Sequence, residues 1–99
     1  MLPLKLTSPG EVQSGVARRA RQLRLDLGLT QAELAERAGL ALRTLRLFEQ
    51  TGKASLEHVV RVAFALSAEA GFEALFPPRP PLSIDDIIAA APRQRARRK

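Results

Sequence analysis

A chain of 99 residues with 45% hydrophobic content can close one small core. The absence of cysteine excludes disulfide bonds and thiolate metal sites, and the Leu- and Ala-rich composition, whose only aromatic residues are four Phe, predicts an all-α fold. The formal net charge is +6, but five of the 16 basic residues (Arg93, Arg95, Arg97, Arg98 and Lys99) lie in the last seven positions, so basic charge alone is weak evidence for a nucleic-acid partner.

The first seven residues predict an extended N-terminal arm. Leu2, Leu4 and Leu6 alternate with other side chains, and Pro3 favours an extended backbone. This segment lacks the apolar run of a signal peptide, and no stretch of the chain is long enough to span a membrane. We therefore expect a cytoplasmic protein without a membrane partner.

The first helix is predicted to begin at Ser8-Pro9-Gly10-Glu11. This segment combines a capping Ser, a Pro at the first helical position and a Glu three residues after the Ser. The helix is expected to end near Leu27, where Gly28 can adopt the left-handed conformation that stops a helix. Its expected inner face consists of Val12, Val16, Ala20, Leu23 and Leu27.

Three further helices are predicted at short intervals. Thr30-Gln31-Ala32-Glu33 repeats the capping pattern and predicts a short helix that ends before Gly39. The next helix runs from about Leu42 to Gln50, and Ser55 is the expected cap of a fourth. The expected buried side of the fourth helix consists of Leu56, Val59, Val60, Val62, Ala63 and Leu66.

A short fifth helix is predicted over residues 69–76, ended by Pro77-Pro78. The Pro-rich stretch to Pro81 is a stiff connector, and Ser83 is a possible cap for a last short helix over residues 84–91. The predicted organisation is therefore an arm at 1–7, a domain at 8–76, a connector with a short amphipathic segment at 77–91, and a disordered basic tail at 92–99.

Residues 31–50 have the features of two helices that cross closely after a tight turn. Ala35 is small enough to stand at the crossing, and Gly39 can supply the positive φ that the turn needs. Five side chains point inward in this arrangement: Leu34, Ala38, Leu40, Leu45 and Phe48. The presence of all these features within twenty residues predicts a helix-turn-helix.

The segment from about Val16 to Leu66 resembles the Xre/Cro/C1-type helix-turn-helix transcriptional regulators. The resemblance is carried by Arg24, Gly28 to Ala35, Gly39-Leu40, Thr44-Leu45, Phe48-Glu49 and Ser55-Leu56. It implies a five-helix, lambda-repressor-like bundle that binds double-stranded DNA as a homodimer on two-fold symmetric operators, and that acts as a repressor. It also implies a salt bridge between Arg24 and Glu49.

The helix that begins at Leu42 is then the one expected to enter the major groove. The candidate DNA-binding residues are Gln31, Leu42, Arg43, Thr44, Arg46, Leu47, Gln50 and Lys53. Arg43 and Arg46 are the first candidates for forked contacts with guanine, whereas Gln31 and Lys53 are placed for phosphates. Without the motif, the two arginines would be interpreted as an ordinary solvated helix face.

Three residues depart from the family pattern, in which polar side chains are usual at these positions. Ala41 gives the third helix no side-chain cap. Leu42 and Leu47 are expected to leave apolar surface on the reading face, where they could contact thymine methyl groups or another protein. The turn after Glu49 is also one residue longer than is common in the family.

Two alternative functions stay open. The layout of the chain resembles HipB-like antitoxins, which are paired with kinase-like toxins, and a stripe of Leu82, Ile84, Ile87 and Ile88 is a candidate surface for such a partner. The same stripe could equally fold back on its own domain or on a second subunit. The other alternative is a protein-interaction module without DNA binding.

An enzyme is not expected, and neither is a cofactor. His58 is the only histidine and is expected near the start of the fourth helix, as a surface or capping residue. Asp85 and Asp86 are adjacent, so on a helix their carboxylates would diverge, and they suit the first turn of a helix better than catalysis. No phosphate-binding loop, metal-ligand spacing or nucleophile motif occurs.

Overall fold

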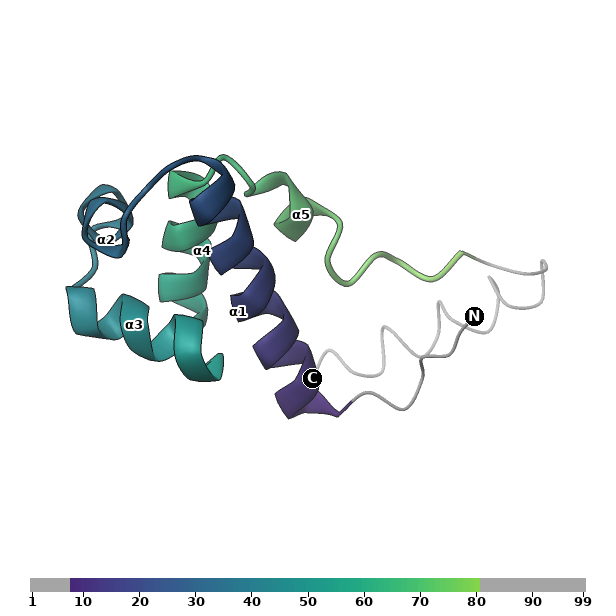
Figure 1. Cartoon of the computed structure of the whole chain (residues 1–99). Coiled ribbons are helices and arrows are strands. Elements are labelled where there is room, and N and C mark those ends of the chain that lie inside the picture. Colours follow the sequence, from purple (N-terminus) through teal and green to yellow (C-terminus); the bar gives the residue numbers. More distant parts are fainter. Residues whose placement is uncertain (1–7, 81–99) are drawn as a thin grey trace, which may run out of the picture.

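The computed structural model describes residues 8–80, which contain helices and no strand (Figure 1). The helices are α1 (Pro9–Asp26), α2 (Gln31–Ala38), α3 (Leu42–Thr51), α4 (Leu56–Ala65) and α5 (Ala70–Glu73). The all-α, five-helix fold predicted from the sequence is confirmed. The predictions for the arm at 1–7, the amphipathic segment at 82–91 and the tail at 92–99 lie outside the described residues, and the division into domains stays a prediction.

Side-chain caps begin three of the helices where the sequence predicted them. The Ser8 hydroxyl accepts the Glu11 amide while the Glu11 carboxylate accepts the Ser8 amide, which forms a capping box at α1. Thr30 and Glu33 make the same pair at α2, and Ser55 accepts the His58 amide at α4. Ala41, before α3, makes no side-chain cap, as expected.

The core lies where α1 packs on α3, and α2 packs on both α3 and α4. In Figure 1, α2 and α3 form one end of the bundle, and the chain after α5 leads away from them. The buried core residues are Ala17, Leu29, Leu34, Ala35, Ala38, Leu45, Phe48, Val62 and Leu66. Leu34 and Leu45 are completely buried, so each helix of the helix-turn-helix is anchored by one enclosed leucine.

Three residues assigned to the core from periodicity are largely exposed instead. Val12 and Leu27 lie at the two ends of α1, and only the middle of that helix, from Val16 to Leu23, packs against the core. Leu56 is the first residue of α4 and is also mostly exposed. Helical periodicity identifies the inner face but not the length of it that neighbouring helices cover.

The fifth helix is half the predicted length. It is a single turn, Ala70–Glu73, rather than residues 69–76. Phe76 lies beyond it with a φ of 59° and an exposed side chain. A segment of this length has too few hydrogen bonds to be helical without packing, and α5 has no buried residue to supply that packing.

Replacement of Gly52 by Ala is expected to destabilise the fold by about 3 kcal/mol, because it combines a left-handed backbone with a steric clash. Gly52 has a φ of 82°, and a Cβ there would lie 2.7 Å from the backbone carbon of Gln13 in α1. Gly28→Ala is the matched control, since Gly28 has a φ of 73° but nothing within 4 Å of the added carbon. It should cost only about 1 kcal/mol. Urea denaturation followed by circular dichroism measures both; equal losses would contradict a close α1–α3 contact at Gly52.

Candidate nucleic-acid interface

The turn between α2 and α3 has the predicted geometry. Gly39 ends α2 with a φ of 72°, and its amide donates to the carbonyl of Glu36 at 3.1 Å. The Leu40 amide donates to the carbonyl of Ala35 at 2.9 Å. Ala35 is buried at the crossing, so the two helices approach closely and α3 leaves the turn in a fixed direction.

The two faces of α3 differ sharply in exposure. Leu45, Phe48 and Glu49 are buried, whereas the other face exposes Arg43, Arg46, Leu47 and Gln50. The side chains that the sequence placed outward on this helix therefore do lie together on one exposed strip, apart from Leu42 and Thr44.

Leu42 and Thr44 are only partly exposed, and Leu42 packs against the core. Leu42 therefore leaves only part of its apolar surface on the reading face. Leu42, Leu45 and Glu49 stand at positions i, i+3 and i+7, which is the spacing of one helix face, so the sequence did contain the signal for its burial. Leu47 is half-exposed, as expected.

The Arg24–Glu49 salt bridge implied by the resemblance is present and buried. The Arg24 Nε donates to Glu49 Oε2 at 2.7 Å, and Nη2 donates to Oε1 at 3.1 Å. The Arg24 Nη1 donates to the carbonyl of Leu29 at 2.8 Å. One guanidinium group therefore joins α1, the loop before α2, and α3 through a bidentate, charge-assisted contact.

Gln31 connects this ion pair to the exposed face of α3. Its side-chain Nε2 donates to Glu49 Oε1 at 2.9 Å, and its Oε1 accepts the Arg46 Nε at 3.3 Å. Helical periodicity could not predict this contact, because Gln31 and Arg46 lie on different helices, 15 residues apart. Both ends of the Gln31 amide group are therefore engaged within the protein, and a contact between Gln31 and a phosphate stays a prediction.

The capping box at α2 has an electrostatic consequence. The hydrogen bond from the Thr30 amide to the Glu33 carboxylate, with a smaller contribution from the Thr30 side chain, lowers the pKa of the Glu33 carboxyl. Because the pKa is lower in the folded state, the stabilisation is present above the unfolded-state pKa and is lost as the pH falls through the folded-state value.

The capping box uses the amide of Glu33. The amides of Gln31 and Ala32, at the first two helical positions, have no intrahelical acceptor and face outward from the helix start.

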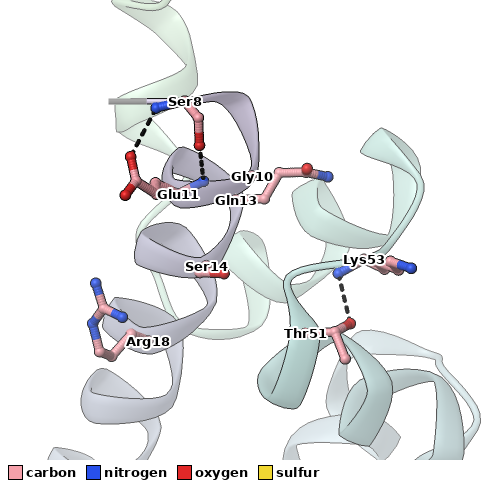
Figure 2. Close-up of a pocket in the computed structure, with 8 residues that line it drawn as sticks. All are labelled: Ser8, Gly10, Glu11, Gln13, Ser14, Arg18, Thr51 and Lys53. Carbon is pink, nitrogen blue, oxygen red and sulfur yellow. Dashed lines mark hydrogen bonds between the residues drawn. The ribbon is translucent and has the colours of Figure 1, made fainter. Parts of the chain in front are cut away.

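Lys53 lies in the turn that follows α3. The Thr51 hydroxyl donates to the carbonyl of Leu47 at 2.7 Å and accepts the Lys53 amide at 3.0 Å, which fixes the backbone of the turn. An open hollow of about 780 Å³ lies between this turn and the start of α1, and Lys53 and Gln13 are among the residues that line it (Figure 2). The Lys53 side chain is exposed and free to approach an anion beside the end of α3.

Two other features are absent from residues 8–80. No three His, Cys, Asp or Glu side chains in that range come together as a candidate metal site. No helix of the described range is long and apolar enough to cross a membrane.

Breaking the buried ion pair from one side is expected to be more damaging than removing it completely. Arg24→Met leaves the Glu49 carboxylate buried without its main partner and should lower the free energy of unfolding by about 3–5 kcal/mol. The double variant Arg24→Met/Glu49→Leu should be clearly more stable than that single variant, because no uncompensated charge remains. Denaturant titration of both proteins measures the difference, and a double variant as unstable as the sum of its single variants would show that the two residues act independently.

The chain matches the helix-turn-helix family model over residues 21–66, from the last third of α1 to the end of α4. No curated protein matches the chain, so the resemblance to HipB-like antitoxins gains no support. The matched range contains the capped α2, the Gly39 turn, α3 and the buried Arg24–Glu49 pair described above. Residues 21–66 are therefore similar to the helix-turn-helix family, in the same part of the chain that resembles Xre/Cro/C1-type regulators.

Proposed function

We propose that this protein is a sequence-specific transcriptional repressor that binds double-stranded DNA as a homodimer and reads it with α3. The observation that carries the proposal is the division of α3 into a buried face, anchored by Leu45 and Glu49, and an exposed strip that holds two arginines. A helix held so firmly on one side can present the other side to DNA in a constant orientation.

The exposed strip suits the major groove chemically. The groove is about 12 Å wide and admits an α-helix, and the edge of guanine presents two acceptors that an arginine can contact with a fork of two N–H groups. Arg43 and Arg46 supply such forks, and Gln50 supplies an amide that can pair with adenine. The amides at the start of α2 and the Lys53 side chain are the groups that we expect to contact phosphates.

The exposed strip of α3 supports DNA binding better than it supports a protein-interaction module without DNA binding. That alternative was based on the apolar surface of Leu42 and Leu47, but Leu42 packs against the core. Leu47 is then a single apolar side chain on the strip, and isolated exposed leucines are common on protein surfaces. An antitoxin function stays a prediction, since the segment at 82–91 that suggested it lies outside the described residues.

Dimerisation is supported by apolar side chains at the far end of the domain. Leu75 and Phe76 follow α5 and are 52% and 88% exposed. Two adjacent exposed apolar side chains favour burial against another apolar surface. A second copy of the chain carries the same two side chains, so two copies can cover each other's Leu75 and Phe76.

The DNA prediction can be tested by selection of bound duplexes from a random pool. Wild-type protein should enrich a palindromic site. Arg43→Ala and Arg46→Ala should each weaken binding to that site by about 1–3 kcal/mol and relax the preference at one base pair in each half-site. Arg61→Ala is the matched control, because Arg61 pairs with Glu57 on α4 and lies off the α3 strip. Failure of the wild-type protein to enrich any sequence would overturn the proposed function.

The dimer prediction can be tested by analytical ultracentrifugation. Phe76→Asp should shift the protein from dimer to monomer at micromolar concentration, because it places a charge in the proposed contact. Leu56→Asp is the matched control. Leu56 is 67% exposed at the start of α4, outside the proposed contact, so this variant should stay dimeric. A wild-type protein that sediments as a monomer, or a Phe76→Asp protein that stays dimeric, would contradict this assignment.

A further inference from the structure

Arg46 is tied at its Nε to Gln31, the first residue of α2, which leaves the outer part of its guanidinium group free. The contact is 3.3 Å long and uses the N–H group nearest the aliphatic stem. The two terminal Nη groups are not hydrogen-bonded to any described residue. They form the planar end of the group, with parallel N–H bonds directed away from the stem, which is the part that can fork onto two acceptors.

The neutral amide of Gln31 fits between two groups of opposite charge. The Glu49 carboxylate on one side needs a donor and receives the Gln31 Nε2, at 2.9 Å. The Arg46 guanidinium on the other side needs an acceptor and receives the Gln31 Oε1. A glutamate in place of Gln31 would repel Glu49, and a lysine would repel Arg46, so only an amide of this length satisfies both partners.

The position of Gln31 is itself fixed by the core. Glu49 is buried and is held by two hydrogen bonds from Arg24. Gln31 is half-buried, so its side chain has fewer accessible rotamers than a surface glutamine. The network therefore runs from a rigid ion pair through Gln31 to a side chain on the exposed strip of α3.

We propose that Gln31 is a positioning residue that holds Arg46 by its Nε, so that the Nη end of Arg46 is presented in advance to a guanine edge. This inference rests on the proposed function and deepens it, since it separates the roles of the two arginines. Arg46 is preorganised by the protein, whereas Arg43 makes no hydrogen bond to a described residue and orders only on DNA. Preorganisation strengthens binding because less side-chain entropy is lost when the contact forms.

The contact itself can be tested without DNA. In nuclear magnetic resonance spectra of the free protein, the Nε–H of Arg46 should exchange with water more slowly than the Nε–H of Arg43, which serves as the internal reference. Gln31→Met removes both hydrogen-bonding ends and keeps a similar length, and it should equalise the two exchange rates. The backbone amide spectrum of the same sample shows that the variant is folded. Equal rates in the wild-type protein would overturn the proposal.

The consequence for DNA reading can be tested by a double-mutant cycle on the selected site. Gln31→Met and Arg46→Ala should be coupled, so that Gln31→Met weakens binding at least about fivefold less in the Arg46→Ala background than in wild type. Gln31→Met should also relax the preference at the base pair that Arg46→Ala relaxes. The matched cycle with Arg43→Ala should be multiplicative. If the effects of Gln31→Met and Arg46→Ala multiply as well, Gln31 acts on DNA independently of Arg46, and the proposal is wrong.

The two experiments separate the inference from the proposed function. If the wild-type protein enriches no DNA sequence, the proposed function fails and the guanine contact fails with it, while the exchange rates still show whether Gln31 holds Arg46. If DNA is enriched but the cycle shows no coupling, the proposed function stands and the positioning role is overturned.

Discussion

The ion pair between Arg24 and Glu49 is the interaction on which the position of α3 depends. Removing two charges from water carries a large desolvation cost, which is offset only when the geometry is good and the remaining donors and acceptors are satisfied. Here the pair is bidentate, a third N–H of Arg24 reaches the Leu29 carbonyl, and the second Glu49 oxygen also receives the Gln31 amide. No buried side-chain polar atom of the described residues lacks a partner. A small rotation of α3 would break several of these bonds at once, so the pair favours one orientation of that helix over its neighbours.

A second constraint acts directly after the same helix, three residues beyond Glu49. Gly52, directly after α3, lies so close to the backbone of Gln13 that no side chain fits between them. The ion pair fixes α3 through side chains and the glycine contact fixes it through backbone packing, and both contacts are with α1. With α3 held in this way, differences in DNA preference are expected to come from the identities and rotamers of the exposed side chains rather than from movement of the helix.

Features that depend on a few neighbouring residues could be predicted from the sequence, and features that depend on the arrangement of whole helices could not. The Ser8, Thr30 and Ser55 caps and the left-handed Gly39 follow from local hydrogen bonding and sterics, and all of them were predicted at the correct residue. The exposure of Val12 and Leu56 depends on how far neighbouring helices extend, which no single helix encodes. The Gln31–Arg46 contact joins side chains of two different helices, so the periodicity of neither helix predicts it.

The chemistry of the exposed strip of α3 indicates what kind of partner suits it. Its composition, two arginines and a glutamine around one leucine, follows from the sequence, but its small apolar area also depends on the packing of Leu42 against the core. A protein partner for this strip would have to supply anions for both arginines and still bury enough apolar area around Leu47, which a single leucine provides poorly. The major groove supplies guanine acceptors for the arginines and thymine methyl groups for Leu47 within the width of one helix. The arrangement of charge around a single apolar side chain therefore favours a nucleic-acid surface over a protein surface as the partner of α3.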